Sequence, residues 1–223
     1  MLKIFVGYDS RETVAYHVLC HSILARSSIP VSFFPLKKEL LRACFDRPDN
    51  PLSSTEFSFS RFLTPFLSGY EGWSLFMDCD MLMTADIDEL MKFADERYAL
   101  RVVKHDYTPK SDTKFFNQTQ SKYRRKNWSS VMLFNNARCK ALTPEVVNSE
   151  SGLFLHQFVW LEDEDIGELP GEWNFLVGEY EKPAETPKLI HYTLGGPYVD
   201  GHEDCDYADR WFAERVRMLN VSR

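Results

Sequence analysis

The sequence feature that most limits the possible folds is a short apolar run that ends in two carboxylates. Residues 73–77 are almost continuously apolar and follow the turn-forming segment 68–72. A short apolar run bounded by a turn is typical of a strand covered on both faces, as in a parallel sheet flanked by helices. Asp78 and Asp80 come directly after this run, and ligand sites in such sheets lie just beyond the carboxyl ends of strands. The pattern therefore predicts an α/β sheet with a divalent-metal site at this strand end.

The Asp-x-Asp spacing alone is weak evidence, because it occurs at four places in the chain. They are Asp78-Asp80, Asp86-Asp88, Asp163-Asp165 and Asp204-Asp206. The second pair opens a short amphipathic helix, where the helix dipole favours acids, and the last two lie in an acidic run or before a C-terminal helix pattern. Only the first pair follows a hydrophobic strand. We therefore assign metal binding to that pair; the alternative is that its carboxylates cap the next turn.

The rest of the chain alternates between strand and helix patterns, which favours a single α/β domain over residues 1–223. The expected strands cover residues 2–6, 31–34, 73–78, 99–104, 131–134 and 189–191, and the expected helices cover residues 12–25, 58–67 and 87–93. Residues 105–127 are polar, and the segment is long enough to suggest a functional loop or lid.

Composition restricts the class of protein and its location. The net charge of −7 argues against a general nucleic-acid binder, and the five scattered cysteines form no Cys-x-x-Cys motif. We expect neither a zinc cluster nor a disulfide framework, and a reducing cytoplasm fits best. The sequence shows no leader and no apolar span of membrane length. We therefore expect a cytoplasmic protein, and peripheral contact with the inner face of a membrane stays open.

The first strand ends in Gly7, Tyr8 and Asp9, which would lie at the same sheet edge as Asp78 if the two strands are parallel. Tyr8 could stack on a nucleotide base, and Asp9 could accept hydrogen bonds from a base or a ribose hydroxyl. The alternative is an ordinary strand-to-helix turn capped by Asp9 or Ser10. No dinucleotide-binding or P-loop glycine motif is present, so a diphosphate would be held by metal and basic side chains.

A second candidate ligand ends the apolar segment 189–191. His191 could complete an oxygen, oxygen, nitrogen site with Asp78 and Asp80, which suits Mn²⁺ and, less well, Mg²⁺. Gly195 and Gly196 follow, and a glycine turn lets the backbone approach a bound group. The alternative for His191 is a packed, hydrogen-bonded core histidine.

Several segments match the motifs of one known family. They are Gly7-Tyr8-Asp9, residues 58–67, Asp78-Cys79-Asp80 with residues 87–90, residues 127–135, the Leu-Pro-x-x-Trp-Asn segment 169–174, and His191. Together they resemble family 8 glycosyltransferases, the glycogenin and bacterial galactosyltransferase group, which have the GT-A fold. The chain departs from the family pattern at Ser130, where glycine is usual, and after His191, where the expected lysine is missing. The family's Asp-Gln element is met only by His156-Gln157.

The resemblance implies a mainly parallel mixed sheet flanked by helices and a metal-dependent sugar transfer. The implied donor is a nucleotide sugar, expected to be a uridine diphosphate sugar. The acceptor is the hydroxyl of a glycan or lipid-linked molecule in cell-surface glycan synthesis, and the anomeric configuration is retained. Gln157 would lie near the anomeric carbon, Asn127 would face the sugar, and Asp106 would hold a sugar hydroxyl. Arg61 would orient Asp78 or contact the donor, unless it forms only a structural ion pair.

These interpretations define three sets of candidate residues. The catalytic set is Asp78, Asp80, Gln157 and Asn127. The donor-binding set is Gly7, Tyr8, Asp9, Arg61, Asp78, Cys79, Asp106, Gly195 and Gly196. The metal set is Asp78, Asp80 and His191, with Mn²⁺ or Mg²⁺ as the cofactor.

Two other functions stay open on the sequence alone. Phosphatases of the haloacid dehalogenase type also place Asp-x-Asp after a hydrophobic strand and use Mg²⁺, with the first aspartate as nucleophile. A nucleotide-sugar-binding module without turnover would account for the missing lysine.

The basic segment 122–126, followed by Trp128, is either a solvated surface or a site for an anionic acceptor or a membrane surface.

Overall fold

The computed structural model describes residues 1–48, 55–106 and 124–220. Its strands are β1 Leu2–Gly7, β2 Val31–Leu36, β3 Trp73–Met77, β4 Met81–Met83, β5 Leu100–Val102, β6 Val131–Asn135, β7 Ile166–Glu168, β8 Phe175–Leu176 and β9 Leu189–His191. Its α-helices are α1 Thr13–Leu24, α2 Thr64–Leu67, α3 Ile87–Met91, α4 Pro144–Ser149, α5 Gly152–His156 and α6 Ala208–Leu219. Most of the predicted loop 105–127, residues 107–123, lies outside the described residues.

The main sheet has six strands in the order β2-β1-β3-β6-β5-β7. β1 pairs in parallel with β2 and β3, and β5 pairs in parallel with β7, whereas β6 runs antiparallel to both β3 and β5. The central strands are buried on both faces, as their continuous apolar sequences predict. The expected mixed, mainly parallel sheet flanked by helices is therefore confirmed.

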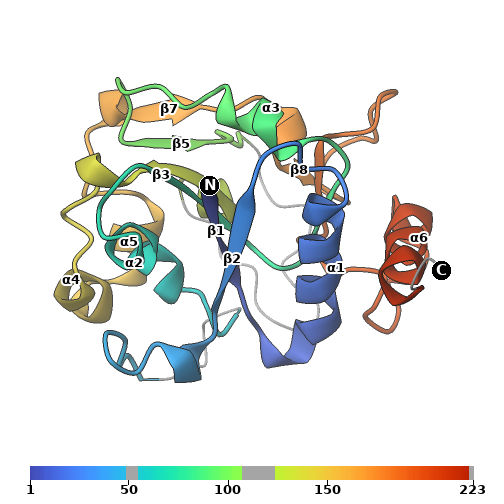
Figure 1. Cartoon of the computed structure of the whole chain (residues 1–223), viewed down its shortest axis with the longest axis horizontal. Coiled ribbons are helices and arrows are strands. Elements are labelled where there is room, and N and C mark those ends of the chain that lie inside the picture. The colour runs from blue at the N-terminus through green and yellow to red at the C-terminus, as the bar shows by residue number, and fades with distance from the viewer. Residues whose placement is uncertain (49–54, 107–123, 221–223) are drawn as a thin grey trace.

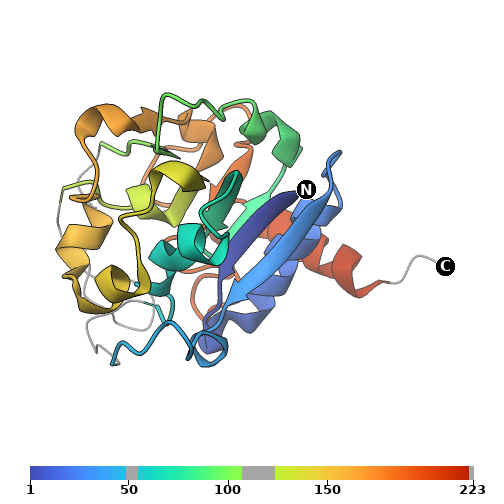
Figure 2. The ribbon, with the colours of Figure 1, turned by 60° about the vertical axis from the view of Figure 1, so that its left-hand side comes forward.

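Helices lie on both sides of this sheet. In Figure 1, α2, α4 and α5 lie to the left of β1 and β2, and α1 and α6 lie to the right; Figure 2 shows the same arrangement after rotation. The helix expected over residues 58–67 is divided into a 3-10 helix, Ser60–Leu63, and α2. The division falls where Pro65 lies in the first turn of α2, a position that proline tolerates because the N–H it lacks would have no helical partner there.

The chain changes sheet immediately after β3, and this change positions the carboxylates. Asp78 still donates its backbone N–H to the Ser130 carbonyl at 2.9 Å, which continues the β3 ladder. The chain then bends at residues 79–80 and enters a second, three-stranded sheet in the order β4-β9-β8. β4 pairs antiparallel with β9, so Met81 lies opposite His191, and Tyr192 donates its N–H to the Asp80 carbonyl at 2.9 Å. Asp80 and His191 are therefore close neighbours.

A smaller apolar cluster joins the second sheet to the two long helices. Val18 of α1, Ile190 of β9 and Trp211 of α6 are all buried in it. Beside it, the buried Glu214 carboxylate of α6 accepts hydrogen bonds from His21 at 2.7 Å and from Arg26 at 2.8 Å. In the described part of the chain, no helix has the length and apolar character needed to cross a membrane.

Candidate metal centre

Asp78, Asp80 and His191 converge at the junction of the two sheets. Each offers one ligand atom, and these atoms lie within 4.8 Å of one another. The Nε2 atom of His191 lies 3.3 Å from Oδ1 of Asp80. Asp80 and His191 are buried, and Asp78 is half-buried. The structure thus brings together the three residues that the sequence suggested as metal ligands.

A chain of hydrogen bonds fixes the orientation of the His191 ring. Its Nδ1 lies 2.9 Å from Oδ1 of Asn174, and the Asn174 amide donates to Oγ of Ser130 at 2.8 Å. The Ser130 hydroxyl in turn donates to the Asn127 carbonyl at 2.7 Å. These bonds run in one direction when Nδ1 carries the proton, which leaves the Nε2 lone pair for a metal ion. Asn174 lies in the Leu-Pro-x-x-Trp-Asn segment, but sequence reasoning gave it no role in the site.

Arg61 holds Asp78 in place from the 3-10 helix Ser60–Leu63. Its Nη1 lies 2.8 Å from Oδ1 of Asp78 and donates to the Ser129 carbonyl at 2.9 Å. The guanidinium is buried and also lies 5.0 Å from the centroid of the Phe76 ring. A buried arginine held by these groups acts on Asp78, so the geometry favours the orienting role among those expected for Arg61.

A buried glutamate beside the aspartates was missed from the sequence, where it looks like an ordinary helix start. The Tyr198 hydroxyl donates to Oε1 of Glu12 at 2.6 Å. Burial and the neighbouring Asp80 charge raise the pKa of Glu12 to about 8. A bound cation would favour the ionised form of Glu12, because opposite charges stabilise one another at short range.

The predicted donor residues at the end of β1 have partners within the protein. A Cβ atom on Gly7 would lie 2.3 Å from the Phe57 ring, so packing alone requires glycine there. Asp9 accepts hydrogen bonds from the backbone of Arg11 at 3.0 Å and of Glu56 at 3.2 Å, and it caps the following 3-10 helix. Burial alone would raise the pKa of Asp9, but the hydrogen bonds from Arg11 lower it. Tyr8 is half-buried, and its hydroxyl lies 3.2 Å from Oγ1 of Thr13.

Two further donor assignments are changed by packing. The Cys79 side chain is fully buried in the main core, and burial raises the pKa of its thiol well above the usual value. The core therefore covers this side chain, and a donor contact at Cys79 would involve its backbone. Gly195 has a φ of 125°, which favours glycine, and a Cβ on Gly196 would lie 2.2 Å from the Tyr198 ring. Glycine at position 195 is therefore explained by its positive φ, and glycine at position 196 by the space that the Tyr198 ring occupies.

The residues expected to face the sugar lie in two places. Asn127 adopts a left-handed conformation with φ 61° and joins the metal centre through Ser130 and Asn174. Gln157 follows α5, and its carbonyl accepts a hydrogen bond from Arg125. Asp106 is exposed and lines the same cavity as that arginine, described below.

His156, which replaces the acid of the family pattern, is half-buried and packs against the rings of Phe59 and Phe62. It lies 2.8 Å from Oγ of Ser129, and burial lowers the pKa of its imidazole to about 3.

Solved structures with the same architecture are glycosyltransferases. GlyE of Streptococcus pneumoniae TIGR4 superposes with a TM-score of 0.63 at 15% sequence identity, over 99% of this chain and 63% of GlyE. LgtC, a galactosyltransferase solved with donor and acceptor sugar analogs, superposes with a TM-score of 0.58 at 14% identity, over 100% of this chain and 98% of LgtC. The chain thus spans less than two thirds of GlyE but nearly all of LgtC. These similarities show a GT-A glycosyltransferase fold and confirm the predicted fold class.

Sequence comparison finds a closer relative. No protein-family model matches the sequence. The protein CDI of Arabidopsis thaliana is 53% identical over 220 residues, which cover 95% of this chain and 85% of CDI. Identity at this level over nearly the full length shows common descent. The chain therefore belongs to the same protein family as CDI of Arabidopsis thaliana.

Proposed function

We propose that this protein is a metal-dependent glycosyltransferase that resembles family 8 enzymes. It transfers a sugar, with retention of configuration, from a nucleotide diphosphate donor to an acceptor hydroxyl, and the expected donor is a uridine diphosphate sugar. The observation that carries the proposal is the convergence of Asp78, Asp80 and His191 within 4.8 Å, at a strand end of a GT-A fold. LgtC, which shares the fold, was solved with donor and acceptor sugar analogs, and this supports the same substrate class here.

The donor set fits a divalent cation. Two carboxylate oxygens and one imidazole nitrogen suit Mn²⁺ better than Mg²⁺, which prefers oxygen ligands alone. Three protein ligands would leave coordination positions for diphosphate oxygens and water, since Mn²⁺ and Mg²⁺ take about six ligands. When bound, the ion would supply a Lewis acid that neutralises the negative charge developing on the leaving diphosphate.

The chain's own residues hold this site in the geometry that the reaction needs. Arg61 keeps the Asp78 carboxylate turned toward the centre, and Asn174 keeps the His191 ring in the tautomer that leaves Nε2 available. Both supporting residues are buried, so their side chains are fixed before any substrate binds. Such preorganisation lowers the reorganisation cost of binding and transfer.

The remaining roles are part of the proposal. Tyr8 stacks on the nucleotide base, while Asn127, Gln157 and Asp106 contact the sugar. A donor contact with Asp9 would require Arg11 to move, because Nη2 of Arg11 lies 2.6 Å from Oδ2 of Asp9.

We also propose that residues 1–223 form one domain, since α1 packs against the second sheet and lies beside the main one. The proposed location is the cytoplasm, which fits the five scattered cysteines.

The two alternatives have less support. A phosphatase of the haloacid dehalogenase type would use Asp78 as its nucleophile, but here Arg61 is ion-paired with that carboxylate. A binding module without turnover would keep the same metal centre, so only an activity measurement separates it from an enzyme.

Replacement of Asp80 tests the proposal directly. Asp80→Asn should lower Mn²⁺-dependent release of uridine diphosphate from its sugar conjugates by about 100-fold or more, because one ligand loses its charge. Asp204→Asn is the matched control, since Asp204 is exposed in another Asp-x-Asp pair. Circular dichroism verifies that both variants fold. Unchanged release in Asp80→Asn would contradict the metal role.

A further inference from the structure

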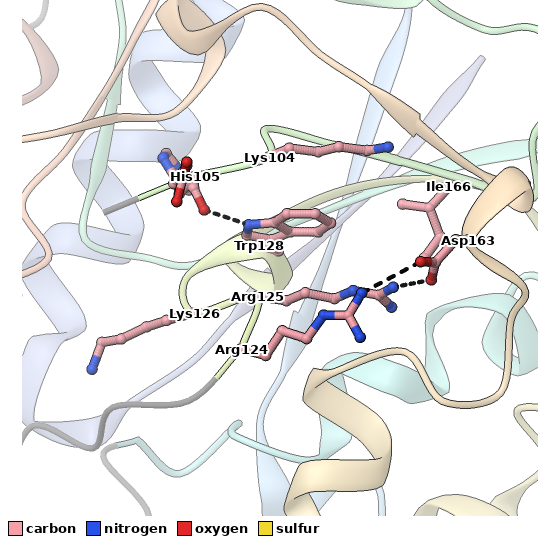
Figure 3. A pocket seen from close by; sticks show the side chains of 9 residues that line it. Lys104, His105, Arg124, Arg125, Lys126, Trp128, Asp163 and Ile166 are labelled. Atoms are coloured by element: carbon pink, nitrogen blue, oxygen red, sulfur yellow. Dashed lines mark hydrogen bonds and ion pairs between the residues drawn. The ribbon is translucent and has the colours of Figure 1, made fainter. Parts of the chain in front are cut away.

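A second site with its own chemistry lies beyond the carboxyl end of β5. It is a cavity of about 330 Å³ in which Lys104, Arg124 and Arg125 lie about the Trp128 indole; Lys126 also lines it, but its side chain points away from that ring (Figure 3). The three residues of the metal centre do not line it. We refer to it as the basic cavity.

The basic cavity has an excess of positive charge in a chain whose net charge is −7. Four cationic residues and two carboxylates, those of Asp106 and Asp163, line it, and Arg124 and Arg125 point toward Asp163 (Figure 3). Asp163 pairs with Arg125 and lies 3.4 Å from Arg124, but its side chain is 66% exposed. The pair of Asp163 with Arg124 is exposed on both sides and contributes little free energy, so an incoming anion can replace Asp163 as the partner of Arg124.

Two features show that the cations are held in place. The Lys104 ammonium lies 5.8 Å, and the Arg125 guanidinium 5.5 Å, from the centroid of the Trp128 ring, and Figure 3 shows the two side chains above and below that ring. The indole itself is fixed because its Nε1 donates to the His105 carbonyl at 2.8 Å. Cations ordered on an aromatic ring lose less conformational entropy when an anion binds.

Arg125 provides the strongest indication that an anion belongs here. Its side chain is only 8% exposed, yet within the described residues its Nε atom has no hydrogen-bond partner. A buried N–H donor without a partner costs free energy, and the Asp163 carboxylate paired with this guanidinium is itself largely exposed. The planar guanidinium presents paired donors that match the oxygens of a phosphate group.

We propose that the basic cavity binds the phosphate group of the acceptor, so that the acceptor is a phosphate ester. This inference rests on the proposed function, which supplies the transfer to an acceptor. Arg125 links the two sites, because it donates to the carbonyl of Gln157, one of the residues proposed to contact the sugar. The phosphate ester is either a soluble molecule or the phosphate of a lipid.

The test measures phosphate binding in metal-free protein without nucleotide. Titration calorimetry uses glycerol 3-phosphate as the soluble probe, and sedimentation uses phosphatidylcholine vesicles with and without phosphatidic acid as the lipid probe. The double variant Lys104→Gln, Arg124→Gln should weaken binding by about 10-fold or more, since two charge-assisted contacts are lost. The matched control is Arg97→Gln combined with Arg215→Gln. Arg97 is 78% exposed and pairs with Asp95 much as Arg124, 71% exposed, pairs with Asp163.

The outcomes distinguish a soluble phosphate ester from a lipid phosphate, and they test the basic cavity separately from the proposed sugar transfer. Binding of glycerol 3-phosphate that the double variant loses and the control keeps supports a soluble ester, and the same pattern seen only with phosphatidic acid supports a lipid phosphate. Binding of neither probe, or equal losses in variant and control, would overturn the inference. Asp80→Asn should bind the probe as the wild type does, so a loss there would assign the phosphate to the metal centre instead. Failure of Mn²⁺-dependent donor binding, by contrast, leaves this measurement unaffected.

Discussion

At the scale of single residues, the metal centre depends on side chains that no ligand touches. Asn174 is the clearest case, because it is buried between His191 and Ser130 and bonds to both. Without it, the His191 ring could rotate and either nitrogen could carry the proton. That rotational freedom would lower the affinity of the site for a metal ion.

Asn174→Ala should therefore weaken Mn²⁺ binding by about 10- to 100-fold, because the hydrogen bond between Asn174 and His191 orients the ring that would bind the metal. Electron paramagnetic resonance of free Mn²⁺ measures the affinity. Asn136→Ala is the matched control, since Asn136 is equally buried but bonds to Ser74 and Glu71 at the other end of β3. Equal affinity in wild type and Asn174→Ala would show that His191 does not depend on this contact.

Half-buried His156 makes stability depend on pH. Its folded-state pKa of about 3 lies below the ordinary value of 6.5, so the unfolded chain binds the proton more tightly. The stability it contributes is fully present above pH 6.5 and is lost as pH falls toward 3, at about 1.4 kcal/mol per pH unit. Urea unfolding at pH 7 and pH 5 should show a smaller loss in His156→Gln than in wild type. The exposed His17→Gln should lose as much as wild type, and identical losses in all three proteins would refute this assignment.

Residues could be predicted from sequence where the signal is local. Asp78 and Asp80 follow an apolar strand and His191 ends one, so each could be identified from its neighbours in the chain. By contrast, glycine is needed at position 7 because the Phe57 ring, fifty residues away, packs against it. The raised pKa of Glu12 likewise depends on Asp80, and its hydrogen bond comes from Tyr198. Such contacts arise only from the tertiary fold, so the sequence reveals neither the packing of Gly7 nor the position of Glu12 near Asp80.

At the scale of elements, β1 illustrates how packing fixes one position. Gly7→Ala should destabilise the protein by about 1–3 kcal/mol, because a Cβ there would lie 2.3 Å from the Phe57 ring and force it to shift. Urea unfolding measures the loss. Gly171→Ala is the control, since nothing lies within 4 Å of a Cβ at that glycine. If both variants lose the same stability, the close contact with Phe57 does not determine the residue at position 7.

The longer elements were predictable, whereas the shortest were predictable only in part: the three-residue strands β5 and β9 lie within the predicted strands 99–104 and 189–191, but three other short strands were not expected. The predicted strands 2–6, 31–34 and 131–134 correspond to β1, β2 and β6, and the helix predicted over residues 12–25 corresponds to α1. β4, β7 and β8 have three, three and two residues, too few to show a period. They exist because a partner strand pairs with them. The antiparallel direction of β6 likewise depends on the path of the whole chain.

At the scale of the whole molecule, the GT-A fold explains why the ligands meet. Asp78 directly follows β3 of the main sheet, and His191 is the last residue of β9 in the second sheet. Asp80 lies in the bend between them, and α1 covers the second sheet. The resemblance to glycosyltransferases indicated this fold from motifs, although it did not reveal that His191 belongs to a separate sheet.

The most direct test is titration calorimetry of the whole chain with uridine diphosphate, in Mn²⁺ and in EDTA, for wild type and Asp80→Asn. The account predicts binding by wild type in Mn²⁺ and a loss of about 10-fold or more in affinity in EDTA or in Asp80→Asn. Parallel titrations with guanosine and adenosine diphosphates identify the preferred nucleotide. Folded wild-type protein that binds none of the three, or that binds equally with and without metal, would contradict the proposed metal-dependent transfer.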